Sequence, residues 1–183
     1  MNIAPTALPG VCVVQSMSLP DPRGSFLRLF CERELATVMG ERHIVQINYS
    51  STAVVGTVRG LHFQHPPRAE MKLVRCMKGR VLDVAVDLRA GSRTFLQWHG
   101  EELAPSSARM LVIPEGCAHG FQVLEANSEL LYLHTAFHAP ELEGGIRFDD
   151  PRLRISWPLP VTGLSDRDRL LPPLEHAFSG IPS

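Results

Sequence analysis

The chain has 183 residues, a formal net charge of −1, 44% hydrophobic residues and 20% charged residues. This length suits one domain with a buried core, and the balanced charge argues against a nucleic-acid-binding protein. No apolar run approaches the roughly 18 residues of a membrane span, and residues 1–12 lack the basic and apolar regions of a secretion signal. We therefore expect one cytoplasmic domain over residues 1–183, with reduced thiols at its four scattered cysteines and no membrane or nucleic-acid partner.

Short apolar segments separated by proline and glycine run along the chain. A short helix is predicted over 32–39, where Glu and Ala are good helix formers. Strands are predicted over 54–63, 72–77, 81–88, 95–103, 110–113, 121–124 and 129–137. The residues from 170 onward predict either a C-terminal extension that wraps over the domain or a short helix. Many short strands in a chain of this size favour an all-β barrel or double-sheet jelly roll, whose mouth is a natural small-molecule site.

The first candidate site lies on the predicted strand 54–63 and continues to Lys72. Arg59 and His62 have opposite parity on a regular strand, so their side chains would point to opposite faces. A bulge or twist near Gly60 would be needed to aim both inward. His62 and Gln64 share a face.

Three further clusters carry polar side chains that chemistry could use. They are His119 within the turn-rich segment 114–121, Tyr132 on an apolar strand, and the charged turn 165–168. Each also has a purely structural interpretation. An isolated strand His is more often hydrogen-bonded within the core, an isolated Tyr is more often packed, and the turn would usually be an exposed helix cap.

A bound metal is a separate hypothesis. The spacing from Pro114 to His119 resembles the second motif of metal-binding cupins, and His62 with Glu70 partly resembles the first. Metal cupins normally place a second histidine where this chain has Gln64, a poor transition-metal ligand. His65 is one residue out of register. We therefore expect no catalytic metal.

Taken together, the motifs resemble the dTDP-4-dehydrorhamnose 3,5-epimerase family, a branch of the cupins, over nearly the whole chain. The matching stretches keep the order and spacing of that family, and they are 21–26, 45–50, 58–64, 72–75, 79–89, 113–121, Tyr132, 145–151 and 164–168. The resemblance implies a cupin-type jelly-roll barrel with a few short helices. It also implies cofactor-independent epimerisation at C3, C5 or both of a nucleotide-linked 4-keto-6-deoxy sugar, of the type that converts dTDP-4-dehydro-6-deoxyglucose to dTDP-4-dehydrorhamnose.

The resemblance assigns catalytic roles to four residues. His62 corresponds to the general base, Asp168 to the carboxylate that orients it, and Tyr132 to the general acid across the sugar ring. Lys72 corresponds to a group near the ketone. These residue types suit the reaction, because removal of a proton beside a ketone creates an enolate that a cation stabilises. Inversion requires a new proton from the opposite face of the ring.

The resemblance also implies how the nucleotide sugar is held. Arg59 corresponds to a group near the ketone and phosphates, and His119 to a further residue of the site. Substrate or nucleotide contacts are implied for Arg23, Gln46, Asn48, Glu143 and Arg167. Forked guanidinium groups suit a diphosphate. Family members are typically homodimers, in which an exchanged N-terminal segment supplies part of the nucleotide site.

Several positions depart from the family pattern at the edge of the site. Arg28 stands where an acidic residue contacts the nucleoside, and Ile47 and Tyr49 replace an aspartate and a histidine. Leu133 follows Tyr132 where lysine is common, and His138 replaces a tyrosine that lines the sugar pocket. The chemistry is thus better supported than the identity of the nucleotide.

Alternative functions remain open from sequence alone. One is an epimerase acting at only C3 or only C5, on a CDP-, GDP- or other dTDP-linked ketosugar. Another is a metal-dependent cupin enzyme, which Gln64 disfavours. The third is a non-catalytic sugar-binding cupin, which the presence of His62, Asp168, Tyr132 and Lys72 disfavours.

Overall fold

The fold is built almost entirely from strands. A computed structural model describes residues 1–182, which contain thirteen strands and two four-residue α-helices. The strands are β1 (Asn2–Pro5), β2 (Cys12–Gln15), β3 (Ser18–Asp21), β4 (Gly24–Leu27), β5 (Gln46–Thr52), β6 (Val58–Gln64), β7 (Lys72–Lys78), β8 (Val81–Asp87), β9 (Trp98–Leu103), β10 (Arg109–Ile113), β11 (Cys117–Val123), β12 (Ser128–His134) and β13 (Glu143–Gly145). The helices are α1 (Ala36–Met39) and α2 (Asp166–Arg169). No helix within residues 1–182 has the length and apolar character needed to cross a membrane.

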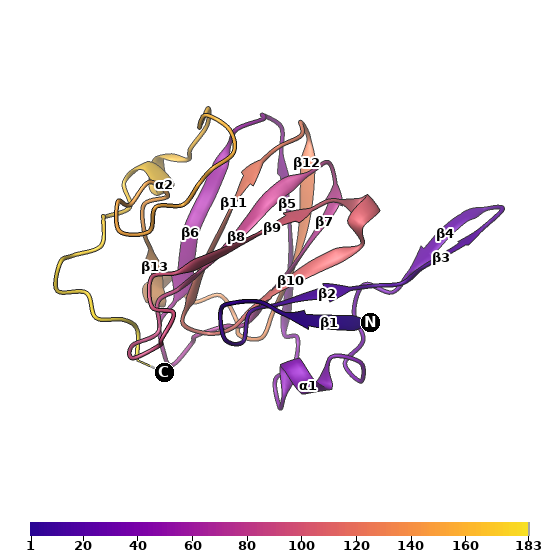
Figure 1. The fold of residues 1–183 in the computed structure, drawn as a ribbon, viewed down its shortest axis with the longest axis horizontal. Helices are drawn as coiled ribbons and strands as arrows, with labels where there is room; N and C mark the ends of the chain where they lie inside the picture. Colours follow the sequence, from indigo (N-terminus) through magenta and orange to yellow (C-terminus); the bar gives the residue numbers. More distant parts are fainter. Residues whose placement is uncertain (183) are drawn as a thin grey trace.

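Two sheets face each other across the core (Figure 1). One has six strands in the order β1-β2-β10-β7-β12-β5, and the other has five in the order β13-β6-β11-β8-β9. Buried side chains from both sheets meet between them, including Val74 and Leu130 from the first and Ala85 and Phe121 from the second. Burial of these apolar surfaces is the main stabilising contribution. The predicted all-β jelly roll is confirmed.

The hairpin of β3 and β4 projects away from the two sheets (Figure 1). Its apolar side chains Leu19 and Phe26 are exposed, by 54% and 64%. Strand β5 forms the free edge of the six-stranded sheet, and Ile47 and Tyr49 on it are each 60% exposed. Hairpin and edge strand therefore present unpaired backbone together with apolar side chains.

The predicted strands all occur, but several of their ends differ. Residues 54–56 form a turn at Gly56, so β6 begins at Val58. The segment 121–124 is only the second half of β11, because the four residues from Cys117 to Gly120 already pair with β8. The predicted helix over 32–39 is reduced to α1. Strands β1 to β5 and β13 were not predicted.

A bulge in β6 turns Arg59 and His62 toward the same side. His119 of β11 pairs with His62, while Phe121 pairs with Arg59, so β6 has one more residue than β11 over this stretch. Gly60 lies in the bulge at φ +118°, and a Cβ there would lie 2.7 Å from the Cα of Gly120. Only glycine allows this conformation and this contact. The predicted bulge is confirmed.

The C-terminal part of the chain packs along the outer face of the five-stranded sheet. Ile146, Leu153 and Ile181 join Leu61 and Phe63 of β6 in a second apolar cluster. This segment includes α2, which lies beside β6 (Figure 1). The predicted domain, 1–183, also includes Ser183, which lies outside the described residues.

Replacement of Gly60 tests the bulge. We expect Gly60→Ala to lower the free energy of unfolding by about 3 kcal/mol, because a Cβ collides with backbone and the φ angle is strained. Gly91→Ala is the control, since Gly91 has φ +71° but nothing within 4 Å of its Cβ position. It should cost only about 1 kcal/mol. Equal losses in urea titrations of the two variants would contradict the steric argument.

Candidate active site

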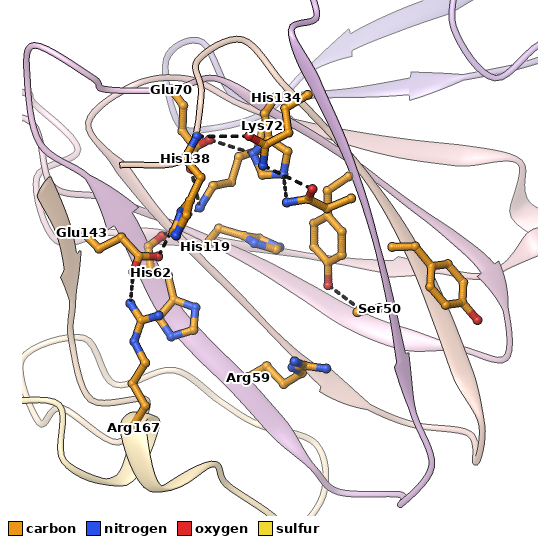
Figure 2. A pocket seen from close by; sticks show the side chains of 14 residues that line it. Ser50, Arg59, His62, Glu70, Lys72, His119, His134, His138, Glu143 and Arg167 are labelled. Carbon is orange, nitrogen blue, oxygen red and sulfur yellow. Dashed lines mark hydrogen bonds and ion pairs between the residues drawn. The ribbon is translucent and has the colours of Figure 1, made fainter. Parts of the chain in front are cut away.

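A cavity of about 330 Å³ opens between the two sheets at one end of the barrel (Figure 2). Its lining is polar and comes from β5, β6, β7, β11, β12, β13, α2 and the segments between them. The lining residues are Gln46, Asn48, Tyr49, Ser50, Arg59, His62, Glu70, Lys72, His119, Tyr132, His134, His138, Glu143 and Arg167.

All but two of the predicted site residues line this cavity. Asp168 lies behind His62 and is buried. Arg23 lies elsewhere, at the turn of the β3–β4 hairpin, where it pairs with Asp21 at 2.7 Å and its side chain is 90% exposed. Within a single chain, the structure therefore does not bring Arg23 to the other predicted residues. Arg28 is likewise outside the cavity and pairs with Glu34.

His62, which is partly exposed to the cavity, is paired with the buried Asp168. His62 Nε2 lies 2.6 Å from Asp168 Oδ1, and the second carboxylate oxygen accepts a hydrogen bond from the Gly60 backbone N–H at 3.3 Å. Burial raises the pKa of Asp168, but the hydrogen bond from His62 and its other contacts outweigh this and lower the pKa overall. The ionised carboxylate holds the proton on Nε2, which leaves Nδ1 of His62 free to accept one.

Helix α2 places Asp168. Ser165 caps the helix, because its Oγ accepts a hydrogen bond from the Asp168 backbone N–H at 3.0 Å. The charged turn 165–168 is therefore a cap, as the structural interpretation held, and it also delivers the carboxylate to His62.

Tyr132 lies on the opposite wall of the cavity. It comes from β12 in the six-stranded sheet, whereas His62 comes from β6 in the five-stranded sheet. Its hydroxyl lies 2.9 Å from Ser50 Oγ on β5. Burial raises the pKa of Tyr132 above its usual value, although the hydrogen bond with Ser50 opposes the shift. The phenol is therefore protonated at neutral pH and can donate a proton.

His119 lies on the floor of the cavity, next to both of these residues. Its Nε2 lies 2.7 Å from Asp83 Oδ1, and both side chains are almost fully buried. Its ring meets that of Tyr132 edge to face, with 6.0 Å between centroids. It pairs with His62 across the strands. A second histidine–carboxylate pair thus lies between the first pair and the tyrosine.

Cationic groups face the cavity from several sides. Lys72 Nζ lies 3.1 Å from Glu70 Oε1 and donates to the His62 backbone carbonyl at 3.4 Å. Arg167 pairs with Glu143 at 2.8 Å, and Arg59 donates to Thr52 at 3.4 Å. Neither guanidinium has all of its donors occupied by these contacts. The cavity therefore suits an anionic ligand.

Gln64 has a structural role at the position where metal cupins place a ligand. Its amide donates to the Arg68 carbonyl at 2.8 Å and accepts from the Ala139 backbone N–H at 2.7 Å. It thereby fixes the segment that carries His138. Over residues 1–182, no group of three or more His, Cys, Asp or Glu side chains is arranged as a metal site.

Sequence reasoning missed Ser50 and His134 as parts of the site. Both follow from alternation along a strand: Ser50 shares a face of β5 with Gln46 and Asn48, and His134 shares a face of β12 with Tyr132. Prediction of the polar segment 46–52 as a strand would have made Ser50 a candidate, whereas His134 already lay on the predicted strand 129–137, two residues after Tyr132. Leu133 points to the other side and is buried in the core.

Comparison with known proteins identifies the same family that the sequence motifs resemble. Residues 5–176 match the sequence model of the family described as dTDP-4-dehydrorhamnose 3,5-epimerase. The chain is 44% identical over 171 residues to the Pseudomonas aeruginosa enzyme of that name, covering 92% of this chain and 93% of the relative.

Solved structures show the same relationship. The Bacillus anthracis dTDP-4-dehydrorhamnose 3,5-epimerase with TDP and PPi bound aligns with a TM-score of 0.91 at 36% identity, over 94% of this chain and 99% of that one. The Legionella pneumophila enzyme in complex with dTDP-4-keto-L-rhamnose aligns at 0.86 and 37% identity, over 95% and 98%. The family match spans nearly the whole chain, and both structures share its two-sheet fold. This chain belongs to the dTDP-4-dehydrorhamnose 3,5-epimerase family.

Proposed function

We propose that the chain is an isomerase that epimerises dTDP-4-dehydro-6-deoxyglucose to dTDP-4-dehydrorhamnose without a cofactor. One observation carries the proposal: a histidine paired with a buried carboxylate and a protonated tyrosine face one cavity from opposite sheets. A sugar ring held between them would meet a base on one face and an acid on the other. Inversion of a stereocentre needs that arrangement.

His62 is the proposed base. Its Nδ1 is the free nitrogen, since Nε2 is bonded to Asp168. A C–H bond beside the C4 ketone breaks, its proton passes to Nδ1, and its electron pair forms the enolate. The imidazolium produced is then stabilised by the Asp168 carboxylate, as in other histidine–carboxylate pairs. The 2.6 Å contact fixes the ring so that the lone pair points in one direction.

Lys72 and Tyr132 complete the proposed reaction. The enolate places negative charge on the C4 oxygen, which the Lys72 ammonium would stabilise. Tyr132 then donates its proton to the carbon from the opposite face. The tyrosinate formed would retain the Ser50 hydroxyl as a hydrogen-bond donor. Arg59 and Arg167 would bind the diphosphate through their remaining donors.

Exchange of carbon-bound hydrogen with heavy water tests the base and acid separately. We expect the wild-type protein to incorporate deuterium at C3 and C5 of the dTDP-ketosugar, as read by NMR. His62→Ala should reduce exchange by at least about 10²-fold, because the base is lost. Tyr132→Phe should still exchange but yield little inverted product.

Parallel assays with CDP- and GDP-linked ketosugars test which nucleotide the protein accepts. The carbons that become labelled show whether epimerisation is limited to C3 or to C5. Absence of deuterium uptake from every sugar would refute the enzyme proposal.

A homodimer with exchanged N-terminal segments is part of the proposal. The projecting β3–β4 hairpin and the free edge of β5 both expose apolar side chains, and each could cover the other in a second copy. In that arrangement the partner subunit's Arg23 would reach the nucleotide end of the cavity. This would account for the position of Arg23 outside its own chain's site.

The dimer can be tested by light scattering and kinetics. We expect twice the chain mass for the wild-type protein, and loss of the dimer in Phe26→Asp, since a charge would be buried in the interface. Arg23→Ala should keep the dimer but raise KM roughly tenfold through a lost contact to the nucleotide. A fully active wild-type monomer would show that the hairpin has another role.

A cytoplasmic location completes the proposal. Cys12, Cys31, Cys76 and Cys117 are free thiols in the structure. Unpaired cysteines are typical of reducing compartments.

A further inference from the structure

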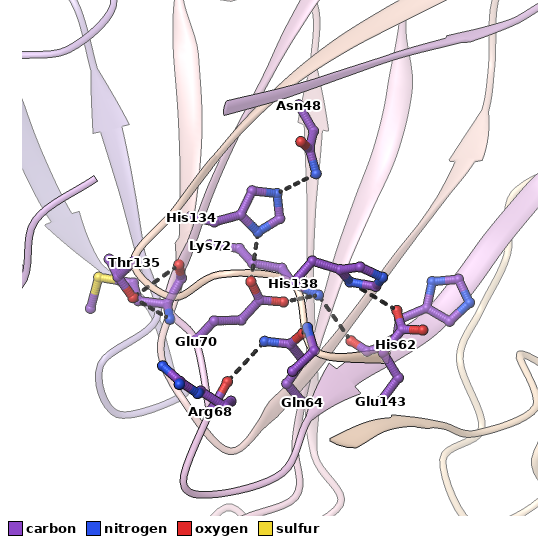
Figure 3. Close-up of polar contacts among 12 residues, drawn as sticks. Asn48, His62, Gln64, Arg68, Glu70, Lys72, His134, Thr135, His138 and Glu143 are labelled. Carbon is purple, nitrogen blue, oxygen red and sulfur yellow. Dashed lines mark hydrogen bonds and ion pairs between the residues drawn. The ribbon is translucent and has the colours of Figure 1, made fainter. Parts of the chain in front are cut away.

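A buried carboxylate links two sides of the cavity, although the proposed reaction gives it no role. Glu70 Oε1 lies 3.1 Å from Lys72 Nζ, and Glu70 Oε2 lies 2.7 Å from His134 Nδ1 (Figure 3). The side chains of all three residues are at most 11% exposed. Burial raises the pKa of Glu70, but the hydrogen bond from His134 and the charge of Lys72 outweigh this and lower it overall. The carboxylate is thus ionised and accepts at both oxygens.

The hydrogen bonds continue from His134 to strand β5. His134 lies on β12 in register with Lys72 on one side and Gln46 on the other. Its Nε2 lies 3.3 Å from Asn48 Nδ2 (Figure 3). Gln46 Nε2 donates to Asn48 Oδ1 at 3.2 Å, and Gln46 Oε1 accepts from the His138 backbone N–H at 3.1 Å. One chain of contacts therefore joins Glu70 to the segment that carries His138.

The direction of every hydrogen bond in this chain is fixed by its two ends. The His138 backbone N–H can only donate, and the Glu70 carboxylate can only accept. Between them, Gln46 donates to Asn48, Asn48 donates to His134 Nε2, and His134 Nδ1–H donates to Glu70. All the donors point the same way, so neither amide can turn over without placing two donors face to face. Such aligned hydrogen bonds strengthen one another.

We propose that Glu70 and His134 are positioning residues, which fix the Lys72 ammonium through one carboxylate oxygen and the Asn48 amide through the other. This inference rests on the proposed function, in which Lys72 faces the ketone and Asn48 contacts the substrate. Neither positioning residue needs to touch the reacting atoms. Their effect is to fix the position of the Lys72 ammonium on β7 relative to the Asn48 amide on β5.

The two arms of the chain should have different kinetic effects. Lys72 acts on charge that develops in the transition state, so release of its anchor lowers kcat. Asn48 would bind ground state and transition state alike, so release of its amide raises KM. His134 holds the Asn48 arm directly, whereas Glu70 holds both.

Replacement of His134 separates the arms. In His134→Asn, the short amide can still donate to Glu70 but does not reach Asn48, so we expect KM to rise roughly tenfold with kcat within about twofold of wild type. In His134→Gln, the longer amide can offer an acceptor to Asn48. We expect it to bring KM back to within about threefold of the wild-type value.

Replacement of Glu70 tests the shared carboxylate. The amide of Glu70→Gln has one acceptor oxygen where two donors converge, so we expect kcat to fall roughly tenfold and KM to rise. Adding His134→Asn to Glu70→Gln should raise KM by less than about twofold further, because the chain is already broken. A purely structural role would give additive effects.

Controls separate this inference from the function on which it rests. Glu129→Gln removes the carboxylate of an exposed Lys78–Glu129 pair between the same two strands, at their other end, and should match wild type. Thermal melts check that each variant is folded. Unchanged KM in His134→Asn, or unchanged kcat in Glu70→Gln, overturns the corresponding arm. A wild-type protein without epimerase activity overturns the proposed function and this inference together, whereas active wild type with equally active variants overturns the inference alone.

Discussion

The close contact between Gly60 and Gly120 determines which side chains of β6 face the cavity. Strands β6 and β11 approach closely there because neither residue has a side chain. The extra residue in β6 reverses the faces to which the side chains after Gly60 point. Arg59 and His62 therefore both face the cavity, whereas on a regular strand one of them would point to the opposite face of the sheet. The same bulge leaves the Gly60 N–H directed at Asp168, so one irregularity both orients His62 toward the cavity and helps to lower the pKa of the carboxyl group behind it.

The cavity is organised by buried carboxylates, each bonded to an imidazole. Asp168 holds His62, Asp83 holds His119 and Glu70 holds His134. A carboxyl group hydrogen-bonded to a ring nitrogen restricts both the tautomer and the orientation of the ring. Three rings with fixed tautomers make a cavity whose donors and acceptors are set before any ligand arrives. Preorganisation of this kind lowers the cost of binding and of charge development.

The sequence predicted the fold class, the strands of the central core and most of the residues that share the cavity. Strands β7, β8 and β10 were predicted because their apolar residues follow a strand pattern and turn-forming residues flank them. Strand β5 was missed because its apolar side chains, Ile47 and Tyr49, are exposed and the alternate side chains that face the cavity are polar, which inverts the usual pattern. Ser50 was missed with it, whereas His134 lay on the predicted strand 129–137 and was overlooked there. Asp168 was identified by resemblance, since nothing local in a charged turn indicates that it meets a strand more than a hundred residues earlier.

Asp168 belongs to the C-terminal wrap and not to the barrel. The pair it forms with His62 joins positions 106 residues apart, through a helix of only four residues held by one serine cap. If the two sheets folded without the C-terminal segment, His62 would be present but Asp168 would not lie beside it. In the proposed reaction, proton abstraction would therefore depend on the docking of the C-terminal segment, which supplies the carboxylate, as well as on the folding of the two sheets.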